Sequence, residues 1–253
     1  MTNETMPIED YLAQGGRLTS PGNVPPRYRG EMLRLMAAFV DSEMAASAGF
    51  ADVINDAPGI TSRIAAARIV LEKADHAERV LGIMAEFGAD TSRYVGTHPW
   101  AKRLGRDADI GAVRQGADMR LAVFHYPLNG WVDAVVMNVL QGAAAVIQLR
   151  EFAQVSYQPL AETFRAILPR EARHAELGRA GLTELAANSA DEVKASLVYW
   201  RPRVALGFGP KESERFDRLR RMGLRHRPNA DLLAEWQDTV AHHLKECGVS
   251  PHA

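Results

Sequence analysis

The stretch from Phe164 to Leu185, FRAILPREARHAELGRAGLTEL, shows most directly how this chain folds. Its apolar residues recur every three or four positions, the spacing that places side chains on one face of an α-helix. Glu171 and His174 fall on the same apolar face, three residues apart, so both head groups reach one point on the packed side of the helix. The stretch therefore predicts a helix that brings a carboxylate and an imidazole into the protein interior.

The same helical period governs the chain from residue 30 to about residue 196, and alternating strand-like runs are scarce. Short turns separate the first helical segment from the second and the third from the fourth, whereas about forty residues separate the second from the third. Two helical hairpins joined by one long crossover are typical of a ferritin-like four-helix bundle, so the expected fold class is all-α. The four expected segments span about 28–49, 60–87, 130–157 and 160–188.

The remaining segments frame this bundle. Residues 1–29 contain Gly-Gly, Pro-Gly and Pro-Pro pairs and are interpreted as an N-terminal arm. Residues 30–253 are then expected to form a single ferritin-like helical domain. Within it, residues 199–211 are predicted to be a Pro- and Gly-rich connector, and residues 229–247 an additional C-terminal amphipathic helix.

Composition narrows the class of protein further. Thirty Lys and Arg residues against 31 Asp and Glu residues give a formal charge of −1, so no global basic charge favours a nucleic-acid partner. The single cysteine, Cys247, excludes an internal disulfide and Cys-based zinc or iron–sulfur sites. The most apolar window, residues 132–149, contains four polar side chains, which argues against a membrane span. The first residues lack the pattern of a secretory signal, and a cytoplasmic protein is expected.

Further polar residues fall on the apolar stripes of the predicted helices. Glu43 continues the stripe of the first segment, and Lys73 and His76 lie on the stripe of the second. A buried carboxylate without a partner strongly destabilises a protein, so this combination of carboxylates and histidines favours a functional cluster over simple packing. Carboxylate and imidazole ligands suit iron or manganese, and ferritin-like sites take them from four helices. The candidate metal ligands are Glu43, His76, Glu171 and His174.

The candidate site departs from a complete two-metal site on the second segment. The residue three before His76 is Lys73, where such sites carry a glutamate. Two unit charges about 4 Å apart repel by roughly 4 kcal/mol at an effective dielectric constant of about 20, so the Lys73 ammonium disfavours a second metal nearby. At most one metal per chain is therefore expected. The neighbouring Glu72 is expected to face mostly solvent.

Six stretches, in one order along the chain, resemble a known family. They are PRYRGEMLRLMAAFVDSEM (Pro26–Met44), FHYPLNGWVDAVV (Phe124–Val136), LQGAAAVIQ (Leu140–Gln148), SYQPLAETF (Ser156–Phe164), REARHAELG (Arg170–Gly178) and FGPKES (Phe208–Ser213). Together they make the chain similar, over about residues 26–250, to the phenylacetic-acid catabolic family of ferritin-like proteins. Within this family the chain most resembles the catalytic A subunits of ring-1,2-phenylacetyl-CoA epoxidases. The resemblance implies a di-iron centre that activates dioxygen and inserts one oxygen atom into the ring of an aromatic acyl-CoA.

The resemblance also implies which residues form the site. Four of the family's metal ligands match residues of this chain, namely Glu43, His76, Glu171 and His174. Lys73 stands where the family has a bridging glutamate, and Gln141 stands where it has an aspartate of the third helix. Both changes remove an anionic ligand, so the resemblance implies an altered metal site.

Segments that border the active centre in the family match residues around the start of the third helical segment. The candidate substrate-binding residues are His125, Tyr126, Trp131, Asp133 and Gln141. The resemblance implies an acyl-CoA substrate, and a free organic acid stays open because the family's C-terminal extension has no counterpart here. It also implies association, either as a homo-oligomer or with a ferritin-like partner subunit.

Three interpretations of the site remain open. In the first, one iron or manganese ion is held by some of the four ligands, and the chain is an atypical oxidoreductase of monooxygenase type that acts on a hydrophobic organic acid or its CoA thioester. In the second, Lys73 replaces the metals and works with Glu43 and Glu171 as a metal-independent acid/base group, since burial can lower the pKa of a lysine. In the third, the chain is a non-catalytic structural subunit of a ferritin-like oxygenase complex.

Overall fold

The computed structural model describes residues 6–96, 99–115 and 118–250, and no strand occurs among these residues. Six long helices dominate the described chain: α2 (Pro26–Val53), α3 (Ile60–Glu86), α4 (Gly130–Phe152), α5 (Gln158–Asn188), α6 (Ala190–Ala205) and α8 (Asn229–Glu246). Two short α-helices are α1 (Ile8–Ala13) and α7 (Glu214–Arg221). The 3-10 turns are η1 (Pro21–Asn23), η2 (Ile54–Asp56), η3 (Ser92–Tyr94), η4 (Pro99–Ala101), η5 (Ala122–His125) and η6 (Leu206–Phe208).

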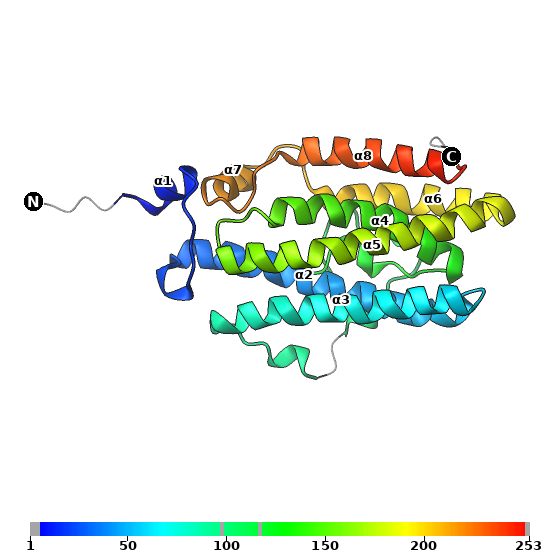
Figure 1. Ribbon diagram of the computed structural model, residues 1–253, viewed down its shortest axis with the longest axis horizontal. Helices are drawn as coiled ribbons and strands as arrows, with labels where there is room; N and C mark the ends of the chain where they lie inside the picture. The colour runs from blue at the N-terminus through cyan, green and yellow to red at the C-terminus, as the bar shows by residue number, and fades with distance from the viewer. Residues whose placement is uncertain (1–5, 97–98, 116–117, 251–253) are drawn as a thin grey trace, which may run out of the picture.

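The long helices form a ferritin-like bundle, which confirms the predicted fold class. Helix α2 packs along α3 and helix α4 along α5, and residues 87–129 cross between these two hairpins. Figure 1 shows the α2–α3 pair below the α4–α5 pair, with α6 and α8 above them and α1 and α7 gathered at one end. Helix α4 therefore lies in the middle one of three layers of helices.

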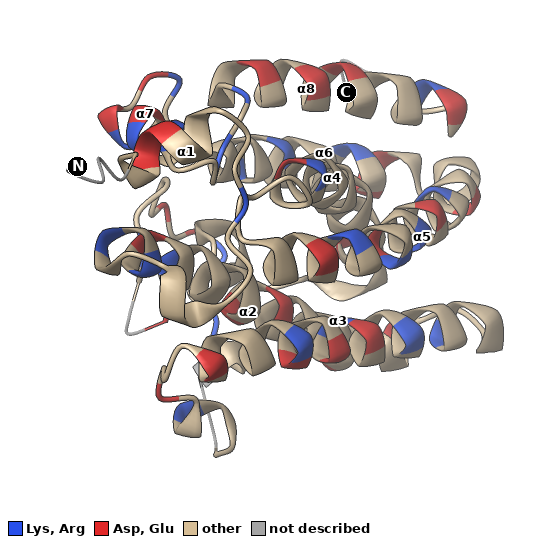
Figure 2. Ribbon diagram, turned by 60° about the vertical axis from the view of Figure 1, so that its left-hand side comes forward, with Lys and Arg blue, Asp and Glu red and all other residues tan. Residues whose placement is uncertain are grey.

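Helix α4 is the central helix of the fold. It is long and apolar enough to cross a membrane by length and composition alone, but 72% of its most apolar window is buried inside the protein. Its inner residues Val136 and Leu140 are fully buried. Figure 2 shows that charged residues instead follow the outer helices α3, α5 and α8. The apolar character of α4 thus belongs to a core helix.

Two element boundaries differ from the prediction. Helix α4 ends at Phe152 rather than near residue 157. The predicted connector at 199–211 is wrong, because helix α6 continues to Ala205 with Pro202 inside it. Trp200 and Val204 of this helix are almost completely buried, and their packing outweighs the helix-breaking effect of the proline.

The N-terminal arm contains more structure than its composition indicates. Leu12, Leu18 and Val24 are buried, and helix α1 contacts α7. The backbone of Leu18 accepts a hydrogen bond from the N–H of Gln158 and donates one to the carbonyl of Ser156. The arm therefore packs on the turn between α4 and α5, and helix α2 begins at Pro26, inside the residues assigned to the arm.

Close packing between α4 and α5 depends on glycines of these two helices. A Cβ atom on Gly178 would lie 2.8 Å from Nδ2 of Asn138 and 3.3 Å from Val139. The Asn138 amide cannot easily move, because it donates a hydrogen bond to the carbonyl of His174 at 2.9 Å. We expect Gly178→Ala to lower the free energy of unfolding by about 1–3 kcal/mol, measured by urea denaturation.

Gly82 of α3 provides the matched control. It is exposed, and a Cβ atom there would have no neighbour within 4 Å. Because alanine has the higher helix propensity, Gly82→Ala should leave stability unchanged or raise it by up to about 1 kcal/mol. Equal effects of the two substitutions would contradict the packing argument.

Candidate active site

Three helices bring five polar side chains together inside the bundle. Helix α2 supplies Glu43, α3 supplies Lys73 and His76, and α5 supplies Glu171 and His174. Each of these residues is at least nine-tenths buried. The periodicity explains this placement, since each residue continues the apolar stripe with which its helix faces its neighbours.

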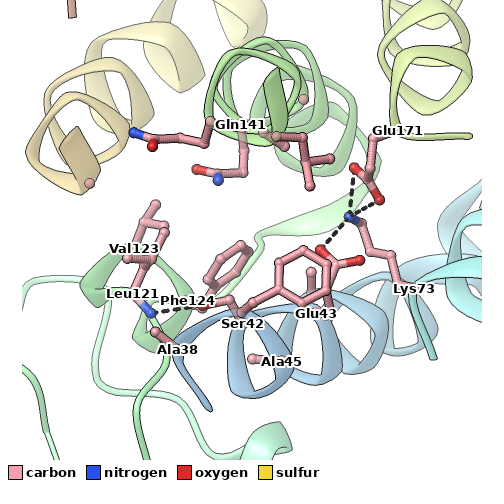
Figure 3. A pocket seen from close by; sticks show the side chains of 18 of the residues that line it. Ala38, Ser42, Glu43, Ala45, Lys73, Leu121, Val123, Phe124, Gln141 and Glu171 are labelled. Atoms are coloured by element: carbon pink, nitrogen blue, oxygen red, sulfur yellow. Dashed lines mark hydrogen bonds and ion pairs between the residues drawn. The ribbon is translucent and has the colours of Figure 1, made fainter. Parts of the chain in front are cut away.

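The ammonium of Lys73 lies between two carboxylates (Figure 3). Its Nζ is 3.2 Å from Oε1 of Glu43, and 3.0 Å and 3.1 Å from the two carboxylate oxygens of Glu171. Lys73 thus bridges α2 and α5 from its position on α3. It lies where carboxylates of two helices would otherwise repel each other.

The two histidines complete the cluster on the other side of these carboxylates. Nδ1 of His76 lies 3.1 Å from Oε2 of Glu43 and 3.1 Å from Oε1 of Glu171. Nδ1 of His174 lies 3.2 Å from Oε1 of Glu171, and its Nε2 lies 2.7 Å from Oε2 of Glu72. The rings of the two histidines stack with centroids 5.9 Å apart. Each carboxylate of the cluster therefore faces more than one cationic or hydrogen-bonding group.

The pKa directions follow from this arrangement. Burial alone would lower the pKa of Lys73, but the charges of Glu171 and Glu43 outweigh burial and raise it. Burial would raise the pKa of Glu171, but Lys73 and hydrogen bonds from His174 and His76 hold it well below its usual value. Burial would lower the pKa of His76, but hydrogen bonds that its ring donates to Glu171 and Glu43 outweigh this effect and raise it. At neutral pH, Lys73 is an ammonium and Glu171 a carboxylate.

The cluster contains a donor set that fits one metal ion. Glu43, His76 and Glu171 each offer a ligand atom, and these atoms lie within 4.8 Å of one another. Two carboxylates and an imidazole suit iron or manganese. The ammonium of Lys73 contacts the same two carboxylates and therefore competes with cations for them.

A cavity of about 250 Å³ reaches this cluster from one side, with Glu43, Lys73 and Glu171 at its inner end. Helices α2 and α4 form opposite walls, and residues of the crossover close a third side (Figure 3). Most of the wall is apolar, as expected for a site that holds an organic molecule. Residues that form the wall include Leu35, Ala38, Phe39, Leu121, Val123, Phe124, Met137, Ala145 and Phe152.

The end of the cavity next to α7, here called its mouth, is lined by arginines. Arg114, Arg215 and Arg225 line both this cavity and an adjoining one near α7. Arg215 pairs with Glu31 at 3.0 Å, whereas Arg225 approaches Glu151 only to 3.9 Å. Burial and the charge of Arg215 lower the pKa of Arg114. Net positive charge at this entrance favours a ligand with an anionic group.

The profile of the family described as "Phenylacetic acid catabolic protein" matches residues 17–253. The chain belongs to this family. No curated protein matches it in a sequence comparison. As a phenylacetic acid catabolic protein, it has the ferritin-like bundle and an interior cluster of carboxylates and histidines that also contains Lys73.

The structure separates the predicted substrate-binding residues of this phenylacetic acid catabolic protein into two groups. Tyr126 and Gln141 line the cavity. His125, Trp131 and Asp133 are not among the described residues that line it. These three lie at or just before the start of α4, close in the chain to residues that line the cavity, such as Phe124 and Ala134.

Asp133 makes polar contacts that the structure defines closely. It accepts hydrogen bonds from the hydroxyl of Ser196 at 2.6 Å and from the backbone N–H of Asn129 at 2.9 Å, and it pairs with Arg106. These contacts tie the start of α4 to α6 and to the crossover. A buried carboxylate with three partners is well satisfied and stabilises the fold locally.

Two sets of residues at the site were not predicted from the sequence. Glu72 was expected to face solvent, yet its carboxylate contacts the buried ring of His174. Glu72 lies next to the inward-facing Lys73, at the edge of the apolar stripe of its helix. This position is the sequence signal by which its contact with the cluster could have been found. The arginines at the mouth come from the crossover and from the segment around α7, and no periodic pattern links them.

Proposed function

We propose that this phenylacetic acid catabolic protein is an atypical oxygenase-type enzyme with at most one metal ion. Its substrate class is a hydrophobic organic acid or the CoA thioester of such an acid. The observation that carries the proposal is the apolar cavity that ends at Glu43, Lys73 and Glu171. Space for an organic molecule beside the candidate ligands is what an oxygenase needs, and a disused site would be expected to fill with side chains.

The metal of this proposal is one iron or manganese ion. Glu43, His76 and Glu171 are the residues that would hold it, with His174 beside Glu171. When bound, such an ion supplies the activation of dioxygen. The residues of the chain itself control the charge of the site and exclude water from it. Lys73 neutralises the carboxylates and limits the number of ions, and the apolar wall excludes water from the reacting part of the substrate.

The mouth and the wall of the cavity suit different parts of the substrate. The apolar wall accommodates the hydrophobic body, whereas Arg114, Arg215 and Arg225 are placed to bind an anionic group at the entrance. Both a carboxylate and the phosphates of a CoA thioester meet this requirement. A substrate of this kind would enter near α7 and lie with its apolar end towards Lys73.

The second candidate function is that of a non-catalytic partner in a ferritin-like oxygenase complex. The observation that favours it is the set of ion pairs among Lys73, Glu43, Glu171 and the two histidines, which satisfies the carboxylates without any ion. In that case the chain would act by association, as a homo-oligomer or with another ferritin-like subunit. A metal-independent role of Lys73 as a base is disfavoured, because a base of this kind needs a lowered pKa and the pKa of Lys73 is raised.

Filling the cavity tests the proposed function directly. Ala145 of α4 lies on the cavity wall, so Ala145→Phe should weaken the binding of aromatic acids and their CoA thioesters by about tenfold or more, measured by isothermal titration calorimetry. Ala180→Phe on the exposed face of α5 is the control and should bind as wild type does. Binding of free acids but of no CoA thioester would assign the free acid as substrate. If wild type binds neither class, the enzyme proposal fails and the partner role remains.

A further inference from the structure

Glu72 reaches the buried cluster from the surface of the bundle. Its side chain is 26% exposed, and its Oε2 lies 2.7 Å from Nε2 of His174, whose side chain is fully buried. The contact joins α3 to α5 through the ring of the histidine. On its other side the same ring faces Glu171, with Nδ1 3.2 Å from Oε1. His174 is therefore held between two carboxylates.

The short contact determines how the ring of His174 is used. A carboxylate accepts hydrogen bonds, so the nitrogen that faces Glu72 carries a proton and donates it. Nε2 is thereby committed to Glu72, and only Nδ1 faces the interior of the cluster. The contact with Glu72 thus sets the orientation of the His174 ring, and this orientation turns Nδ1 towards Glu171.

His76 provides an internal comparison. Its Nδ1 contacts Glu43 and Glu171, but its buried Nε2 has no hydrogen-bond partner among the residues that the structure describes. Of the two clustered histidines, His174 is therefore the one whose Nε2 contacts a carboxylate. Histidines in metal sites commonly donate their second ring N–H to such a carboxylate, which orients the ring for its ligand role.

We propose that Glu72 is a positioning residue of the site. It holds His174 in the orientation in which Nδ1 supports Glu171, and through His174 it keeps Glu171 aligned with Glu43 and His76. For cation binding this inference rests on the proposed function, whereas the orientation of His174 does not depend on any metal. Glu72 acts through His174 and need not touch substrate or metal itself.

The first experiment observes the ring directly in the metal-free protein. In protein with ¹⁵N-labelled histidine, the Nε2–H of His174 should give a slowly exchanging NMR signal, assigned by its loss in His174→Gln. The signal should exchange at least about tenfold faster or disappear in Glu72→Leu, and it should persist in Glu72→Gln, whose amide oxygen still accepts the hydrogen bond. Glu78→Leu, on the exposed face of the same helix, is the matched control. An unchanged signal in Glu72→Leu would overturn the inference.

The second experiment measures the consequence for the cluster. Titration with Mn²⁺ alone should give an affinity about 10–100-fold weaker for Glu72→Leu than for wild type, as for other residues that orient metal-binding histidines. Glu72→Gln should restore most of the affinity, and Glu78→Leu should retain all of it. Equal affinities of wild type and Glu72→Leu would refute the positioning role. If wild type binds no Mn²⁺, the one-metal function fails, and the NMR signal alone decides the role of Glu72.

Discussion

Replacing Lys73 with methionine should lower the free energy of unfolding by about 3–5 kcal/mol, because it leaves buried carboxylates without their cation. Glu171 and Glu43 are only 1% and 6% exposed, so bulk water solvates their charges poorly once the ammonium is gone. Methionine keeps most of the length of the lysine stem, so the lost charge rather than a cavity dominates the effect. Urea denaturation at neutral pH measures it.

The exposed Lys194 of α6 supplies the control for this substitution. Lys194→Met removes the same charge at the surface, where most substitutions change stability by no more than about 0.5 kcal/mol. Equal stability of the two variants would show that Glu43 and Glu171 do not depend on Lys73. Turnover provides a second measurement: loss of activity in Lys73→Met is expected if the site is functional, and equal turnover of wild type and variant would end a catalytic role for Lys73.

The fold was predictable because its signals are local. Apolar stripes with helical period run through each long helix, and the turn at residues 55–60 and the long crossover are visible as breaks in these stripes. Local sequence signals mislead where tertiary packing overrides a helix-breaking residue. Pro202 predicts the end of a helix, yet burial of Trp200 on the same turn extends α6 past it.

The centre of the candidate site was predictable from the helical period, whereas its edge and its cavity were not. Glu43, Lys73, His76, Glu171 and His174 lie in the centre of their stripes, so their convergence follows from the packing of three helices. Glu72 lies at the edge of a stripe, where only the distance to a neighbouring helix decides whether a side chain is solvated or bonded. The cavity and the arginines at its mouth depend on how the crossover and the α7 segment fold back, and periodicity carries no information about that.

Introducing a glutamate at position 73 should increase metal uptake. Wild type should bind at most one iron or manganese ion per chain, because the ammonium of Lys73 contacts both carboxylates that a second ion would need. Lys73→Glu removes this cation and adds an anionic ligand between Glu43 and Glu171. Elemental analysis after anaerobic loading with Fe²⁺ or Mn²⁺ should therefore show uptake rising towards two ions per chain.

The same substitution should make the stability of the protein depend on metal. Without an ion, Lys73→Glu places three carboxylates together in the interior, so the variant should unfold at a lower temperature than wild type. Added Mn²⁺ should raise its unfolding temperature, because an ion that binds only the folded state stabilises it by mass action. Gln141 lines the cavity and is uncharged, where the family resemblance implies an aspartate. The double variant Lys73→Glu/Gln141→Asp should therefore bind the second ion more tightly than Lys73→Glu alone. Two equivalents in wild type would refute the electrostatic argument, since Lys73 would then not exclude the second ion. An unchanged stoichiometry in the double variant would refute it as well, because charge would then not be what limits the site.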